Sequence, residues 1–151
     1  MLDDFDFDLV KKTSRVSLRT VVDTLKKTPI TKHTIATESA LENRLFEYLD
    51  KKYTIVKRQY NIGGHLGLKI DLDIGDGAVG IEAKVLGQYL KKTAEIHRLF
   101  GQLLYYSRRK YNNNNLIVVF AGAPGGDTSP VFQEVKEIIQ ELKVSVVYLS
   151  P

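Results

Sequence analysis

The chain has 151 residues, of which 43% are hydrophobic and 26% are charged, and it contains no cysteine. This size and composition are typical of one globular domain with a buried core. The lack of cysteine excludes disulfides, zinc–thiolate sites, iron–sulfur clusters and cysteine nucleophiles. No apolar run reaches the length of a membrane span, and the first residues lack a basic signal-peptide region, so we expect a cytoplasmic protein with no membrane partner.

The net charge of +4 is unevenly distributed along the chain. The first eight residues hold four aspartates and no base, which leaves 22 basic residues against the remaining 14 acidic residues. Such a balance favours a polyanionic partner such as DNA. The residues that we expect to contact nucleic acid are Lys57, Arg58, His65, Lys91, Lys92 and Arg98.

The N-terminal region divides into an acidic arm and a helix. Phe5 and Phe7 alternate with aspartates in the arm, and residues 14–27 place apolar side chains at helical spacing before Pro29. We expect residues 1–35 to form an N-terminal extension, followed by a domain at residues 36–151. Residues 1–30 are the predicted surface for a second copy or another partner.

Residues 37–50 predict a second amphipathic helix, with Leu41, Leu45 and Leu49 in its buried stripe. Ser39 and Glu42 have the spacing of a capping box, which would begin the helix. Glu42 has two interpretations. It compensates the helix N-terminus, or its carboxylate points over a neighbouring sheet toward a metal ion.

Three strands are expected next, at residues 53–60 and on either side of a turn at Asp76-Gly77 within residues 70–85. This turn predicts a hairpin in which Ile74 opposes Val79 and Asp71 opposes Glu82. Alternation along the strands then places four polar side chains on one face: Asp71, Asp73, Glu82 and Lys84. The other face would carry Ile70, Leu72, Ile74, Ile81, Ala83 and Val85.

The polar face of this hairpin needs an explanation, because like charges placed opposite each other destabilise a pair of strands. A divalent cation between Asp71 and Glu82 would turn this repulsion into coordination, and oxygen ligands suit Mg²⁺ or Mn²⁺. The other interpretation is a solvated hairpin face with a cross-strand salt bridge.

The remaining sequence predicts a helix near residues 92–111, a buried strand at 116–121, a helix at 130–142 and a strand at 144–149. Gln102 and Tyr106 lie one helical turn apart and can face the same point. The element order predicts an α/β fold with a central mixed sheet flanked by helices.

Residues 36–121 resemble the PD-(D/E)XK, or restriction-endonuclease-like, nuclease superfamily. Glu82-Ala83-Lys84 is similar to its (D/E)XK element, and Asp71 to the preceding aspartate, although Ile70 stands where the motif has proline. Glu42 is similar to the helix glutamate of many members. Gln102 and Tyr106 resemble the Gln-x-x-x-Tyr element of the branch that contains recombination exonucleases.

This resemblance implies a restriction-endonuclease-like core and metal-dependent DNA hydrolysis, with an endonuclease of repair, recombination or defence as the expected class. It implies Mg²⁺ or Mn²⁺ bound by Asp71, Glu82, the Ala83 carbonyl and Glu42. Lys84 would position and activate the attacking water, and Gln102 and Tyr106 would orient the site or hold the nucleic acid. Asp73 is the alternative ligand if the register of the turn differs by two residues.

Two other functions remain open at this stage. The chain is an inactive nuclease-fold module that binds nucleic acid or organises an assembly, or it is a ribonuclease. Small nucleases similar to junction resolvases and restriction enzymes act as homodimers, so a homodimer is one expected assembly.

Overall fold

The computed structural model describes residues 11–89 and 93–151, so the expectations for the arm at residues 1–10 and for Lys91 and Lys92 lie outside the described residues. Five strands form one mixed sheet in the order β1-β2-β3-β4-β5. The first three strands are antiparallel, and β3, β4 and β5 run parallel. The strands are β1 (Val56–Asn61), β2 (Lys69–Ile74), β3 (Val79–Val85), β4 (Leu116–Ala121) and β5 (Ser145–Leu149).

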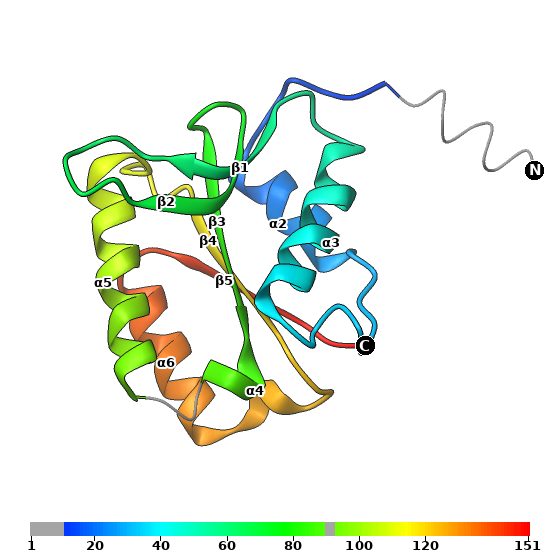
Figure 1. Cartoon of the computed structure of the whole chain (residues 1–151), viewed down its shortest axis with the longest axis vertical. Coiled ribbons are helices and arrows are strands. Elements are labelled where there is room, and N and C mark those ends of the chain that lie inside the picture. The colour runs from blue at the N-terminus through cyan, green and yellow to red at the C-terminus, as the bar shows by residue number, and fades with distance from the viewer. Residues whose placement is uncertain (1–10, 90–92) are drawn as a thin grey trace, which may run out of the picture.

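Helices cover both faces of this sheet (Figure 1). The helices α2 (Leu18–Lys26) and α3 (Glu38–Asp50) lie on one face. The helices α5 (Thr93–Arg109) and α6 (Pro130–Glu141) lie on the other, and the short helix α4 (Leu86–Tyr89) follows β3. The predicted α/β class and mixed sheet are therefore confirmed. In the described part of the chain, no helix has the length and apolarity needed to cross a bilayer.

Two hydrophobic clusters form the core, one on each face of the sheet. The strand β4 contributes to both, because its six residues are all buried, as a continuous apolar run predicts for a central parallel strand. Helix α2 belongs to the first cluster, where Val21 and Leu25 are completely buried. It begins at Leu18, later than residue 14, because the Ser17 hydroxyl accepts a hydrogen bond from Thr20 N and caps the helix.

The β2–β3 hairpin has the predicted register, with Ile74 opposite Val79 and Leu72 opposite Ile81. Asp76 and Gly77 have φ values of 56° and 99°, so both adopt the left-handed conformation expected at this turn. The register of residues 72–74 with residues 79–81 is therefore the one that the turn predicts.

The prediction that Ile70 shares a face with Leu72 and Ile74 is wrong. Leu72 and Ile74 pack in the cluster beneath α2 and α3, whereas Ile70 packs in the cluster of α5 and α6. The switch coincides with Gln59 on the neighbouring strand, which has a φ of 47°. The change of face also falls where the regular pairing of β2 with β3 ends, because this ladder covers Leu72–Ile74 but not Ile70. A regular period of two does not foresee such an end.

Asp73 lies opposite Gly80, as predicted, but its environment differs from a polar face. It is completely buried, and its carboxylate accepts hydrogen bonds from the Tyr111 hydroxyl and, at 2.8 Å, from Gly77 N. Burial raises the pKa of this carboxyl, which these two donors partly oppose. Asp73 therefore fixes the turn and the segment after α5. The register does not differ by two residues, which was the condition for Asp73 as the alternative ligand.

Candidate active site

Helix α3 supplies two glutamates to a group of charged side chains on the inner strands β2 and β3. Its N-cap is Thr37, whose hydroxyl accepts a hydrogen bond from Ala40 N at 3.1 Å, so the expected capping box of Ser39 and Glu42 is wrong. Glu42 lies beyond the first turn, where compensation of the helix N-terminus is weak. Of its two interpretations, the carboxylate that faces the sheet agrees better with its contacts.

Asp71 lies where β2 and β3 stop pairing as a regular ladder. Its Oδ2 accepts a hydrogen bond from Ala83 N at 2.8 Å, so a side chain replaces a backbone acceptor at this point. The N–H and C=O of one strand residue point to the same neighbouring strand, so the Ala83 carbonyl also faces β2. Asp71 and the Ala83 carbonyl thus lie on the same side of β3.

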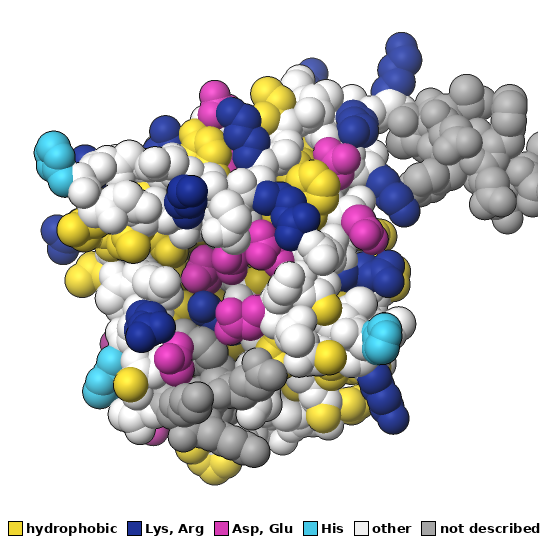
Figure 2. All heavy atoms as spheres, in the orientation of Figure 1, with side chains coloured by type: hydrophobic (Ala, Val, Ile, Leu, Met, Phe, Trp, Pro, Cys, Tyr) yellow, Lys and Arg dark blue, Asp and Glu magenta, His cyan; other side chains and the backbone are white. Residues whose placement is uncertain are grey.

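Glu82 and Lys84 complete the group from β3. Glu82 Oε1 accepts a hydrogen bond from Asp71 N at 3.4 Å, and Lys84 Nζ lies 3.4 Å from Glu82 Oε2. Lys84 Nζ also lies 3.9 Å from Glu38 Oε2, so the lysine bridges β3 and α3. Figure 2 shows acidic side chains gathered in the middle of this face of the molecule, with lysine and arginine side chains around them.

Burial controls the protonation of this group. Glu82 is only 3% exposed, and its burial and the nearby Asp71 carboxylate raise its pKa to about 8, although Lys84 opposes this shift. Burial also raises the pKa of Glu38, again against the influence of Lys84. A buried carboxyl of this kind keeps its proton near neutral pH unless another positive charge, such as a metal ion, replaces the proton.

Gln59 links the two halves of the site. Its Nε2 donates to Glu42 Oε1 at 3.0 Å and to Asp71 Oδ1 at 3.3 Å. Arg58 Nε lies 3.5 Å from the same Glu42 oxygen, and its guanidinium stacks on Phe46. The amide and the guanidinium therefore hold Glu42 toward Asp71 rather than toward the solvent.

The oxygen atoms of this group are of the type that Mg²⁺ binds, but they are not arranged as a complete set of ligands. Asp71, Glu82 and the Ala83 carbonyl offer oxygen ligands on neighbouring strands, and Mg²⁺ typically binds one or two carboxylates while it keeps several waters. Within residues 11–89 and 93–151, no three acidic or histidine side chains are already arranged around one point. The residues fit an ion held by Asp71 and Glu82, with Glu42 close by through Gln59.

The Gln-x-x-x-Tyr pair lies on α5. Tyr106 is buried, and its hydroxyl donates to the Lys69 carbonyl at 3.1 Å, so it fixes the start of β2 two residues before Asp71. Gln102 Oε1 is buried and accepts no hydrogen bond from the described residues. Tyr106 thus supports the strand that carries Asp71, while the structure gives no contact that joins Gln102 to the acidic group.

The residues expected to bind nucleic acid are spread over several elements. Lys57 pairs with Asp76 at 3.2 Å, and Arg98 pairs with Glu95 at 3.6 Å. Arg58 borders the acidic group, and His65 is exposed in the loop between β1 and β2. Of these four described residues, only Arg58 has a contact within the site.

Two contributors to the site were not among its predicted residues. Glu38 is one turn before Glu42, a spacing that places both on one face of α3, so the sequence held a signal for it. Gln59 had none, because neither its left-handed backbone nor its position beside Asp71 follows from the residue type.

Comparisons of the chain with protein-family models, curated proteins and solved structures gave no match.

Proposed function

We propose that this chain is a nuclease that uses Mg²⁺ or Mn²⁺ to hydrolyse phosphodiester bonds in DNA. The observation that carries the proposal is the contact of Asp71, Glu82 and Lys84 at the point where β2 and β3 separate. Two neighbouring acids, one of which lies beside an ammonium group, have little structural benefit, because burial and the charge of Asp71 disfavour the charged form of Glu82. A reaction that needs a bound cation would explain why these charged side chains lie together.

In this proposal, Asp71, Glu82 and the Ala83 carbonyl hold the metal ion, with Glu42 as a direct or water-mediated ligand. The ion would polarise a phosphoryl oxygen and lower the pKa of a bound water. Lys84 holds the attacking water and neutralises negative charge that develops on the phosphoryl group. Its contacts with Glu82 and Glu38 restrict the position of the ammonium group, which favours preorganisation.

Cleavage assays test this proposal directly. Plasmid, single-stranded, flapped and four-way-junction DNA, and RNA, would be incubated with the protein in Mg²⁺, Mn²⁺ or EDTA. We expect metal-dependent cleavage of DNA that falls about 100-fold or more in Glu82→Gln and in Lys84→Ala. Glu137→Gln, an exposed change on α6, is the matched control and should cleave normally. Cleavage that survives both site substitutions would defeat the proposal, and cleavage of RNA alone would reassign the substrate.

A second candidate function is a module that binds nucleic acid without cleaving it. Four contacts favour it: Lys84 is engaged by Glu82 and by Glu38, and each of the two oxygens of Asp71 already accepts a hydrogen bond. Calorimetry separates the candidates. The nuclease should bind Mn²⁺ and lose this binding in Asp71→Asn, whereas the module should bind DNA equally well with and without Mn²⁺.

A further inference from the structure

Exposed apolar side chains gather on the outer face of α5 and α6. Among the described residues, five large hydrophobic side chains are exposed, and three of them lie on these two helices. Leu104 is 46% exposed, Val131 48% and Ile138 36%. The two helices pack side by side on one face of the sheet (Figure 1). Single exposed apolar residues are normal, but a group on two neighbouring helices indicates a surface that another molecule covers.

Each of the two helices carries a stripe of exposed residues at intervals of three or four positions. The stripe on α5 consists of His97, Gly101, Leu104 and Arg108. The stripe on α6 consists of Val131, Glu134, Ile138 and Glu141. Residues at this spacing share one side of a helix. Because the buried residues of both helices face the sheet, the two stripes point outward and form one surface.

The charges of the two stripes have opposite signs. The α5 stripe has Arg108 near its C-terminal end and no acid, whereas the α6 stripe has Glu134 and Glu141 and no base. None of these three side chains forms an ion pair with another described residue. A basic stripe beside an acidic stripe is complementary to a second copy of the same surface, because each stripe can then meet its opposite.

The direction of the helices determines how two copies fit. The strands β3, β4 and β5 are parallel, so α5 and α6, which connect them, run in the same direction. A twofold axis parallel to the helices therefore lays α5 of each copy on α6 of the other, with their C-terminal ends together. Leu104 and Arg108 are about 6 Å apart along α5, and Ile138 and Glu141 about 4.5 Å apart along α6. The apolar contact and the ion pair can thus form at the same time.

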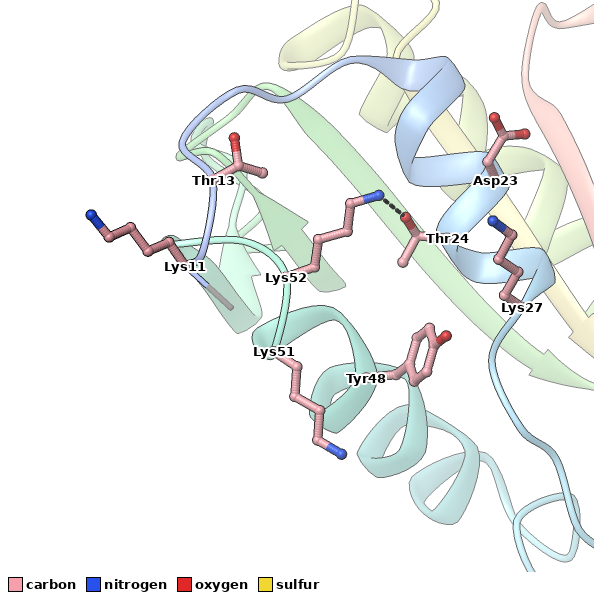
Figure 3. Close-up of a pocket in the computed structure, with 8 residues that line it drawn as sticks. All are labelled: Lys11, Thr13, Asp23, Thr24, Lys27, Tyr48, Lys51 and Lys52. Carbon is pink, nitrogen blue, oxygen red and sulfur yellow. Dashed lines mark hydrogen bonds between the residues drawn. The ribbon is translucent and has the colours of Figure 1, made fainter. Parts of the chain in front are cut away.

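The opposite helix layer does not offer such a self-complementary surface. A pocket of about 480 Å³ lies between α2 and the C-terminal end of α3, and four lysines and one acid, Asp23, line it. The ammonium groups of Lys11 and Lys51 point away from this pocket, and Lys52 donates to Thr24 (Figure 3). A surface on which one sign of charge predominates repels a second copy of itself, so α5 and α6 fit a second copy better.

We propose that this chain forms a twofold dimer through the exposed stripes of α5 and α6. Leu104 packs against Ile138 of the partner subunit, and Arg108 pairs with Glu141 of the partner subunit. The symmetry repeats both contacts, so a single surface supplies both sides of the interface. This surface differs from residues 1–30, which the sequence suggested for a partner. It shares no residue with the acidic group, so the inference does not depend on the nuclease proposal.

Sedimentation equilibrium in EDTA, at protein concentrations from about 1 µM to about 1 mM, tests this proposal. We expect particles of twice the chain mass of 17.1 kDa at the higher concentrations. Leu104→Asp should weaken association about tenfold or more, because it places a charge in the apolar contact. Leu66→Asp changes another exposed leucine, in the loop between β1 and β2, and is the matched control that should associate like wild type. Circular dichroism confirms that both variants are folded.

Exchange of charges tests the twofold arrangement. Arg108→Glu and Glu141→Arg each place like charges opposite one another, so each should weaken association about tenfold. An equimolar mixture of these two variants should associate again, because every acid of one variant then meets a base of the other. Arg19→Glu, an exposed change on α2, is the control for a reversed charge and should associate like wild type.

Three results would overturn the proposal. The first is a protein that is monomeric at about 1 mM, and the second is association that Leu104→Asp leaves unchanged. The third is a mixture of the two charge variants that associates no better than either variant alone, which would remove Arg108 and Glu141 from the contact. Association that is lost on removal of residues 1–10, and is unaffected by the substitutions on α5 and α6, would assign the dimer to the arm instead.

Discussion

Glu82 is the residue that most strongly constrains the site. It is buried in a fully buried strand, next to Asp71 and Lys84, and its pKa of about 8 reflects the cost of a charge in this position. In the metal-free protein the carboxyl is largely protonated at neutral pH. A bound cation would favour the charged form, so protonation and metal binding should oppose each other.

The free energy of unfolding of the metal-free protein should therefore fall as the pH rises from about 5 to about 8. The ordinary pKa of 4.5 applies to the unfolded chain, and the folded pKa is about 8, so between these values the folded state retains a proton that the unfolded state has lost. We expect the free energy of unfolding of the Glu82→Gln protein to gain on the order of 3 kcal/mol relative to wild type between pH 5 and pH 8. Urea unfolding in EDTA measures this, and a difference independent of pH would contradict it.

Metal binding should show the opposite dependence on pH. Because Glu82 must lose its proton to act as a ligand, the affinity for Mn²⁺ should rise up to about tenfold per pH unit below pH 8. Calorimetry in buffers of different ionisation enthalpy would also detect the released proton. Asp71→Asn should abolish the binding, whereas Asp127→Asn, in the short helix before α6, should bind like wild type. Affinity that does not change with pH would exclude Glu82 as a ligand.

The β2–β3 hairpin depends on a close contact at Gly80. A Cβ at this position would lie 2.5 Å from Tyr111 Cζ and 2.8 Å from Ile70 Cδ1, so no side chain fits unless the core moves. Gly80→Ala should destabilise the protein by about 2–3 kcal/mol through overpacking. Gly101→Ala on α5, where a Cβ meets nothing within 4 Å, should instead stabilise it by about 0.5–1 kcal/mol. Thermal unfolding gives the melting temperatures of the two variants, and equal changes in melting temperature would refute the role of Gly80.

The left-handed backbone of Gln59 on β1 gives a second prediction at this scale. Glycine adopts a φ of 47° without strain but lacks the amide that bridges Glu42 and Asp71. Gln59→Gly should keep or slightly raise the melting temperature and weaken Mn²⁺ binding about threefold to tenfold. Gln59→Ala should weaken binding equally and lower the melting temperature. A Gln59→Gly protein that binds Mn²⁺ like wild type would show that the amide is dispensable.

The elements were predictable from the sequence because they depend on local patterns. Apolar spacing gave the helices and strands, and the Asp76-Gly77 turn gave the hairpin register. The switch of Ile70 to the other face was not predictable, because it falls where the regular pairing of β2 with β3 ends, and no residue type in the sequence marks that point. Likewise, the helix cap fell at Thr37 rather than Ser39, since both residue types cap well and tertiary contacts decide between them.

The prediction for the whole molecule concerns the N-terminal region. The sequence proposed residues 1–30 as a partner surface, but Val21 and Leu25 of α2 are completely buried against the sheet. Removal of residues 1–30 should therefore unfold or severely destabilise the protein, because it deletes part of the core. Removal of residues 1–10 keeps α2 and should leave a folded protein. Circular dichroism and solution mass of both truncations test this, and a lower mass per particle in the shorter deletion would support a dimer formed by the arm.

The parallel pairing of β3 with β4 has a consequence for the order of folding. During synthesis, all the charged residues of the site precede β4, the parallel partner of β3, by about thirty residues or more. These residues are Glu38, Glu42, Asp71, Glu82 and Lys84. Until β4 is synthesised and docked, we expect Glu82 to be more exposed to water and its pKa to lie closer to the ordinary value. A nascent or truncated chain that ends before residue 116 would thus contain every acid of the site and still lack its chemistry.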